Sequence, residues 1–221
     1  MVLAQSFPVT LPVLFGYIAI GVPFGLMLVK AGYPWWLSPI MSLVMYAGAG
    51  QYIAIGLFAS KAPFSAMVLT MLMVNIRHIV YGLSLIKQFR IAGAWKPYLI
   101  FSLTDETYAL LTGVKVPPRI PAGPFYGMIA LLNQSYWIFG STLGAIAGQL
   151  IPFSFRGVDF ALTALFAVLL IDQIRRTKDV VPPIIGFGCA IASVLFAGSS
   201  NMLIVALISS MVLLILVRGR S

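Results

Sequence analysis

Two clusters of ionisable and polar residues interrupt otherwise apolar stretches of the sequence. Asn75, Arg77 and His78 lie near the middle of one apolar run, and Asp105 and Glu106 lie near the middle of the next. A charged side chain at the centre of a bilayer costs at least about 2.5–3.5 kcal/mol, so its presence there requires a reason. A structural ion pair between two helices, with Arg77 paired to either carboxylate, is one explanation. A substrate or proton site is the other, and it is favoured because two adjacent carboxylates exceed what one arginine neutralises.

The spacing of these residues predicts which of them share a face of a helix. Asn75 and His78 are three residues apart and share a face, whereas Arg77 lies on a row with Tyr81 and Ser84. His78 is a candidate proton carrier, although a single histidine beside an ion pair is also a typical hydrogen-bonding partner. The carboxylates belong to a polar stripe that we expect to face the protein interior. This stripe consists of Ser102, Asp105, Glu106, Ala109 and Gly113.

Glycine-rich segments in the first two apolar runs predict interruptions of the backbone. In segment 21–25, Pro23 stands between two glycines, which predicts a kink or an unwound turn. Segment 46–51 places small residues and Gln51 at mid-membrane. Broken helices expose N–H groups and carbonyls that bind the carboxylate and ammonium of an amino acid, whereas close helix packing is the alternative explanation. The predicted substrate-binding residues are Pro23, Phe24, Gly25, Gly48, Gly50, Gln51 and Asn75.

The elements that must position these residues are apolar runs long enough to cross a bilayer. Hydrophobic residues make up 61% of the 221 residues and charged residues 9%, against about 25% charged residues in soluble proteins. A spanning helix needs about 20 mainly apolar residues. The sequence therefore predicts an all-α polytopic membrane protein, a single transmembrane domain over 1–221 with seven or eight spanning helices, some of them broken. The predicted runs are 11–29, 35–59, 63–86, 97–113, 124–152, 158–174, 180–196 and 199–217.

The charge balance bears on partners and orientation. The 14 basic against 5 acidic residues would suggest nucleic-acid binding in a soluble chain. Here the basic residues lie mostly between apolar runs, where they orient helices, so we expect a lipid bilayer and no nucleic acid as partner. With eight spans they weakly favour cytoplasmic termini, but the basic connectors 87–96 and 175–178 fall on opposite sides. A re-entrant element between them would explain this, and Asp172 beside the second connector indicates an interfacial ion pair.

A glycine pattern occurs twice in the chain. Two glycines four residues apart, followed by a third after a turn, occur within 21–32 and again within 144–157. The pattern is consistent with half-repeats of about 10–113 and 124–217 with inverted topology, a recurrent transporter architecture. Chance similarity between common packing motifs is the alternative. A stripe on the fifth run either lines a cavity or, as we prefer, forms a seam between helices. This stripe consists of Asn133, Trp137, Gly140, Gly144 and Gly148.

Enzymatic functions find little support in the sequence. The single Cys189 excludes an internal disulfide and a multi-cysteine metal site, and the single His78 excludes a multi-histidine site. The sequences Gly-x-Ser-x-Gly, His-Glu-x-x-His and Walker A do not occur. We therefore expect no catalytic residue, no metal and no cofactor. Without a nucleotide-binding sequence, any pumping would depend on a gradient or on another subunit.

Several segments of the sequence resemble segments of a known protein family. The matching segments are FGLMLVKAGYPWW (24–36), SLVMYAGAGQYIA (42–54), VNIRHIVYGLSL (74–85), LTDETYALL (103–111), GSTLGAIAGQLIP (140–152) and DFALTALFAVLL (159–170). In these segments, over about residues 10–175, the chain resembles the AzlC family of branched-chain amino-acid permease-like proteins. The resemblance implies the large subunit of a proton-coupled exporter of leucine, isoleucine, valine and sometimes methionine. It further implies a small AzlD-type membrane subunit as partner and a multi-pass location in a bacterial inner membrane.

Two classes of function follow. The first is a secondary transporter that exports branched-chain amino acids, in which the helix breaks and Asn75 hold the zwitterion. Asp105, Glu106 and His78 then carry or gate protons beside Arg77. The alternative is a non-transporting scaffold or channel subunit of a membrane complex, in which the charges serve assembly alone. A membrane-embedded enzyme is a third reading, with less support.

Overall fold

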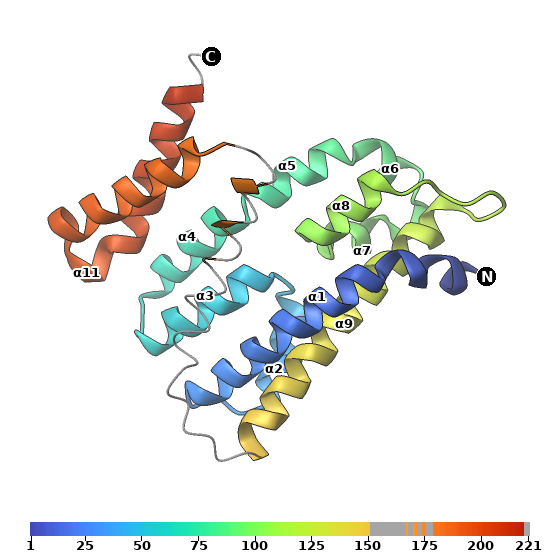
Figure 1. Cartoon of the computed structure of the whole chain (residues 1–221), viewed down its shortest axis with the longest axis horizontal. Helices are drawn as coiled ribbons and strands as arrows, with labels where there is room; N and C mark the ends of the chain where they lie inside the picture. The colour runs from blue at the N-terminus through green and yellow to red at the C-terminus, as the bar shows by residue number, and fades with distance from the viewer. Residues whose placement is uncertain (151–166, 168–169, 172–173, 176–178, 219–221) are drawn as a thin grey trace. The chain divides into compact units, whose positions relative to one another are not determined.

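The computed structural model describes residues 1–150, 167, 170–171, 174–175 and 179–218. Within these residues the backbone forms helices joined by turns, without a strand (Figure 1). The all-α prediction is therefore confirmed for this part of the chain. Most of the predicted run 158–174, including Asp172, lies outside the described residues.

Most of the chain is helical, and the helices differ greatly in length. The longest are α1 (Val2–Lys30), α9 (Ala122–Leu150) and α11 (Val181–Arg218). The shorter ones are α2 (Leu37–Val44), α3 (Gly48–Ala59), α4 (Phe64–Asn75), α5 (Arg77–Ser84), α6 (Ile86–Arg90), the 3-10 helix η1 (Gly93–Trp95), α7 (Lys96–Phe101) and α8 (Asp105–Gly113). Within the part of the chain that the structure describes, two stretches are long and apolar enough to cross a membrane, namely α1 and the α4–α5 pair, Phe64–Ser84.

The contacts divide the chain into two compact units. The first comprises Met1–Lys61 with Val74–Val158, and the second comprises Ala62–Met73 with Asp159–Ser221. All the contacts of the candidate site described below lie in the first unit. A single transmembrane domain over 1–221 stays a prediction.

In the first unit α1 and α9 pack side by side along most of their length (Figure 1). Gly140 lies against the backbone of Ile18, and Gly148 lies against Leu26. Because both numbers rise together along the contact, the two helices run in the same direction. If α1 and α9 were equivalent helices of two half-repeats with inverted topology, they would run in opposite directions. The glycine pattern therefore reflects helix packing, and the inverted repeat is not confirmed.

The α1–α9 contact is a seam made by small residues. A methyl group added at Gly144 would collide with the backbone of Val22, and one added at Gly25 would collide with the backbone of Ser141 and Ala145. Small residues let helix backbones approach this closely, which is how helices associate where lipid offers no hydrophobic drive. For the glycines of the stripe on the fifth run, Gly140, Gly144 and Gly148, the preferred interpretation as a seam between helices is confirmed, whereas Asn133 of the same stripe contacts α8.

Three of the predicted spans are interrupted. The run 35–59 is divided between α2 and α3 at residues 45–47, and the run 97–113 is divided between α7 and α8 at residues 102–104. The run 63–86 is interrupted at Ile76, between α4 and α5. The first of these interruptions matches the prediction from the glycines of segment 46–51. The other two were not expected, because neither contains glycine or proline.

One of the two distortions predicted at segment 21–25, the unwound turn, is absent, and a kink there stays a prediction. α1 continues through Pro8, Pro12 and Pro23 as a single helix of 29 residues, so the unwound turn expected at segment 21–25 does not form. In the same region of α1 the hydroxyl of Tyr52 donates a hydrogen bond of 2.5 Å to the carbonyl of Ile20, which ties α3 to α1.

The C-terminal element is α11, for which the sequence predicts two short spans, 180–196 and 199–217. The structure assigns Val181–Arg218 to one helical element of 38 residues, whose ribbon doubles back on itself (Figure 1). The predicted division into two spans is therefore not contradicted and stays a prediction.

Candidate functional site

The two adjacent carboxylates lie in the first turn of α8. Thr104 is extended and caps this helix, and its hydroxyl accepts a hydrogen bond of 3.2 Å from the backbone N–H of Thr107. Asp105 and Glu106 follow directly, where the unpaired N–H groups and the helix dipole stabilise negative charge. The backbone break therefore provides a local reason for two carboxylates inside an apolar run.

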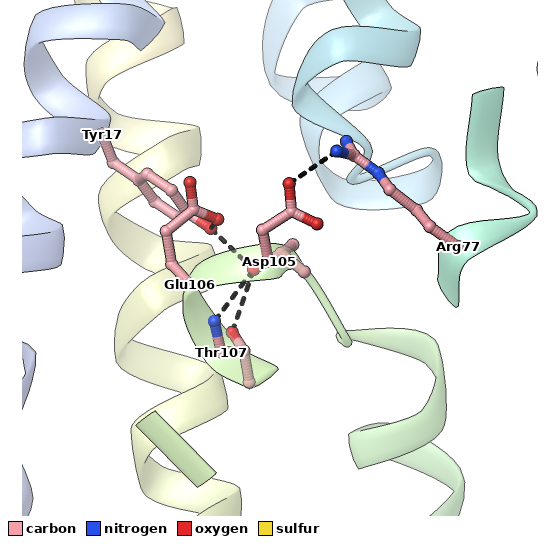
Figure 2. Close-up of polar contacts among 6 residues, drawn as sticks. Tyr17, Arg77, Asp105, Glu106 and Thr107 are labelled. Carbon is pink, nitrogen blue, oxygen red and sulfur yellow. Dashed lines mark hydrogen bonds and ion pairs between the residues drawn. The ribbon is translucent and has the colours of Figure 1, made fainter. Parts of the chain in front are cut away.

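Asp105 points toward α5. Its Oδ2 forms an ion pair of 2.7 Å with Arg77, and both side chains are roughly half exposed, at 42% and 43% (Figure 2). Of the two pairings that the sequence allows, the structure has the one with Asp105. Further along the same interface the rings of Tyr81 and Tyr108 stack with centroids 4.4 Å apart, and Ser84 donates to the Tyr108 hydroxyl at 3.1 Å. The predicted row of Arg77, Tyr81 and Ser84 thus forms the contact with α8.

Glu106 points the other way, toward α1 (Figure 2). The hydroxyl of Tyr17 donates a hydrogen bond of 2.7 Å to Oε2 of Glu106 and lies 2.7 Å from the hydroxyl of Thr104. Tyr17 is 4% exposed, so the half-buried carboxylate is held on its inner side by a buried phenol. Two residues adjacent in sequence therefore occupy different electrostatic surroundings, because one faces a guanidinium and the other faces hydroxyl groups.

A cluster of buried polar side chains connects α8 with α9. The amide nitrogen of Asn133 donates to the hydroxyl of Thr107 at 3.0 Å. The carbonyl oxygen of Asn133 and the hydroxyl of Tyr46 are buried without a hydrogen bond, and Tyr46 lies beside the side chains of Tyr17 and Thr107. Buried polar atoms without partners cost about 1–3 kcal/mol each, and others occur elsewhere in the described residues, at Ser6, Ser38, Thr70, Gln88 and Thr142. This cluster differs because its unpartnered atoms adjoin the acidic turn of α8.

The break before α3 brings two predicted binding residues together. Tyr46 has a positive φ of 35°, a strained conformation for a residue with a side chain. α3 begins two residues later at Gly48. A methyl group at Gly50 would lie 3.4 Å from the amide nitrogen of Asn75, so the small residue lets α3 approach the end of α4.

Gln51 connects helices through its amide group. Its oxygen accepts a hydrogen bond of 2.8 Å from the indole of Trp137, and its nitrogen donates to Ser42 at 3.2 Å. Ser42 lies in turn 2.8 Å from the hydroxyl of Ser141. Gln51 is completely buried. Its position therefore joins α2, α3 and α9 and leaves little of the amide for a ligand.

The predicted residues on α1 lie in an aromatic cluster. Phe24 is completely buried, with ring centroids 5.6 Å from Tyr52 and 6.1 Å from Trp137. Gly48 adjoins the same Trp137 ring. Gly25 belongs to the seam with α9, and Pro23 is inside the continuous helix. In this structure Pro23, Phe24 and Gly25 pack within or against the continuous helix α1, and their role in substrate binding stays a prediction.

His78 lies beside the ion pair at the start of α5. It is partly exposed, and its ring contacts Tyr81 edge to face with centroids 5.9 Å apart. The interruption at Ile76 separates it from Asn75, which ends α4. Among the residues that the structure describes, no group of three His, Cys, Asp or Glu residues is placed to hold a metal ion.

Sequence reasoning missed four residues of the polar cluster. Tyr17, Tyr46, Thr107 and Asn133 were not among the predicted site residues, although Asn133 lay on the predicted seam. A threonine followed directly by two acidic residues is a helix-start signal, so Thr104 could have revealed the break before α8. No local pattern joins Tyr17 or Asn133 to this turn, because they come from α1 and α9.

Comparisons with known proteins identify relatives. The family described as AzlC protein matches residues 12–151. An uncharacterized membrane protein of Helicobacter pylori is 37% identical over 214 residues, covering 97% of this chain and 94% of its own length. The branched-chain amino acid transport protein AzlC of Bacillus subtilis is 33% identical, covering 97% and 84%. Inner membrane protein YgaZ of Escherichia coli is 29% identical, covering 77% and 72%. No solved structure gives a significant match.

Proposed function

Because the chain belongs to the AzlC family, we propose that it is a secondary transporter of branched-chain and other apolar amino acids that acts as a proton-coupled exporter. The name of the Bacillus subtilis relative supports the substrate class. One observation carries the mechanism: the interruptions between α2 and α3, α4 and α5, and α7 and α8 adjoin one another. Gly50 meets Asn75, Arg77 pairs with Asp105, and Tyr46 lies close to Glu106.

Interrupted helices suit a zwitterionic substrate. The first N–H groups of α3, at Gly48 to Gly50, have no partner within their own helix and favour a carboxylate. Asn75 adjoins this turn and supplies a further polar group. Gln51, Phe24, Gly25 and Pro23 act by holding α1, α3 and α9 together. This division of roles follows the half-helix sites of other secondary transporters.

The acidic turn of α8 supplies the negative charge for coupling. Asp105 and Glu106, with His78 and Arg77 beside them, are the ionisable residues that the fold gathers at these breaks. Exchange of protons against substrate would drive export without a nucleotide. The full assembly that we propose spans a bacterial inner membrane seven or eight times, includes a small AzlD-type subunit and catalyses no chemical change.

A scaffold or channel subunit is the second candidate. The Arg77–Asp105 ion pair, whose side chains are half exposed, is the observation that favours a scaffold or channel subunit. Charged side chains at such a position can also form contacts with another subunit. The two candidates differ in whether the protein itself shows saturable exchange of substrate.

Counterflow in liposomes distinguishes the candidates. The purified protein is reconstituted with and without the small partner, and the liposomes are loaded with unlabelled leucine. A carrier takes up labelled leucine transiently, saturates, and is inhibited by valine and methionine. A non-saturating leak without stimulation by internal leucine would indicate a channel. Mass spectrometry of the same samples detects any altered product, and absence of exchange by the folded complex would overturn the proposal.

A further inference from the structure

Of the two carboxylates on α8, we infer that Glu106, together with Asn133 and Tyr46, binds the primary ammonium group of the transported amino acid, whereas Asp105 fastens α8 to α5. This inference rests on the transport function proposed above and assigns one part of the site. It follows from the distribution of charge, from the buried acceptors and from their position relative to α3.

The distribution of charge separates the two acids. The guanidinium of Arg77 lies 2.7 Å from Asp105 and neutralises it. The described contacts of Glu106 are with hydroxyl groups, chiefly that of Tyr17 at 2.7 Å, and the structure gives it no ion pair within the described residues. Unlike Asp105, Glu106 has no cationic partner among the described residues, so the negative charge of its ionised form is left to attract a cation.

The buried acceptors fit an ammonium group. A primary ammonium has three N–H donors and no acceptor. The carboxylate of Glu106 supplies one acceptor, and the free oxygens of Asn133 and Tyr46 supply two more. Asn133 is 0% exposed and Tyr46 is 4% exposed, and both adjoin Thr107. A third unpartnered oxygen, Oδ1 of Asp105, belongs to the carboxylate already paired with Arg77.

The position of Tyr46 links this cluster to α3. Tyr46 directly precedes Ala47, the residue that caps α3, while its hydroxyl reaches the cluster around Tyr17 and Thr107. One end of this short segment therefore presents backbone N–H groups, which favour a carboxylate. The other end presents oxygen acceptors and a negative charge. This pattern is complementary to an α-amino acid and selects against a fatty acid or an amine alone.

Equilibrium binding of labelled leucine to the purified complex tests the inference. Two competitors each carry one of the two charged groups of leucine. 3-Methylbutylamine has the ammonium without the carboxylate, and 4-methylpentanoate has the carboxylate without the ammonium. We expect both to compete weakly with leucine on the wild-type protein. Glu106→Gln should weaken leucine binding by at least about 30-fold, because it removes a charged partner. The same variant should abolish competition by 3-methylbutylamine and keep competition by 4-methylpentanoate.

Smaller changes test the two neutral acceptors. Asn133→Ala and Tyr46→Phe should each weaken leucine binding by about 5- to 10-fold, the value of one hydrogen bond. Asp179→Asn is the matched control, because it makes the same change of acid to amide just before α11, where Asp179 accepts the backbone N–H of Val181, in the other unit. We expect leucine binding to be unchanged in this variant.

The outcomes separate the two proposals. If the wild-type complex does not bind leucine, the proposed function fails. If the wild-type complex binds leucine and Glu106→Gln binds it within about 2-fold, the ammonium site is wrong and the function stands. Retained binding with loss of proton-driven transport would likewise overturn the inference, since Glu106 would then carry protons alone. If Glu106→Gln does not fold, competition on the wild-type protein decides, because failure of 3-methylbutylamine to compete contradicts the inference.

Discussion

The seam between α1 and α9 contrasts with the zone where the shorter helices are interrupted. In the seam the backbones are continuous for 29 residues in each helix, and glycines make the contact. In the interrupted zone the helices are short, and the charged residues lie at their first turns. The difference indicates that glycines in an apolar run have two uses: in the seam they allow close contact of backbones even beside Pro23, and before α3 they accompany a break in the helix.

The contrast also assigns mechanical roles. The long helices share a dry contact in which a single added methyl group would meet backbone, so we expect them to move together. The interrupted helices are joined by a few polar contacts between side chains, which can exchange partners at small cost in free energy. The predictions below test this division, beginning with the seam.

The largest effect is expected at Gly25. Gly25→Ala adds a methyl group that collides with the backbone of Ser141 and Ala145, so α1 and α9 must separate. We expect most of the folded protein to be lost, measured by fluorescence-detected size-exclusion chromatography in detergent. Gly16→Ala is the matched control in the same helix, because nothing lies within 4 Å of the added methyl group. Equal yields of the two variants would show that the seam is looser than described.

A smaller effect is expected at the ion pair. Arg77→Gln leaves Asp105 without a cation, and we expect a loss of about 1–3 kcal/mol in stability, with a lower Tm in a thermal-shift assay. The double variant Arg77→Gln with Asp105→Asn removes both charges and should recover part of that loss. If the double variant is no more stable than the single variant, Asp105 does not depend on Arg77 for its charge balance.

The smallest effect is expected at the cap of α8. Thr104→Val removes the hydroxyl that accepts the N–H of Thr107, at a cost of about 1 kcal/mol. This corresponds to a decrease in Tm of about 2–4 °C for a chain of this size. Thr104→Ser keeps the hydroxyl and should restore the wild-type Tm. A Tm for the valine variant equal to that of the serine variant would contradict the assigned cap.

Local spacing predicted the parts of the site that lie on single helices. The row of Arg77, Tyr81 and Ser84 follows from three- and four-residue intervals, and the structure places it against α8. The glycine stripe of α9 was likewise readable from its four-residue spacing. Proline was a poorer guide, because the fold accommodates Pro23 inside a continuous helix.

The remaining parts depend on contacts between distant segments. Tyr17 meets Glu106 across 89 positions, and Thr107 meets Asn133 across 26. A pattern in one helix does not specify which tyrosine or asparagine of another helix faces it. The interruption at Ile76 was also not predicted, because segment 74–78 contains neither glycine nor proline, and the moderate helix propensities of its residues do not locate a break.

The parallel pairing of α1 with α9 has a consequence for biosynthesis. The two helices begin 120 residues apart, and at about 5–20 residues per second α9 leaves the ribosome roughly 6–24 s after α1. During this interval the glycines of α1 and the hydroxyl of Thr10, which contacts Tyr136 of α9, lack the helix that covers them in the folded protein. The earliest helix to be made therefore completes its main contact only after α9 has been synthesised.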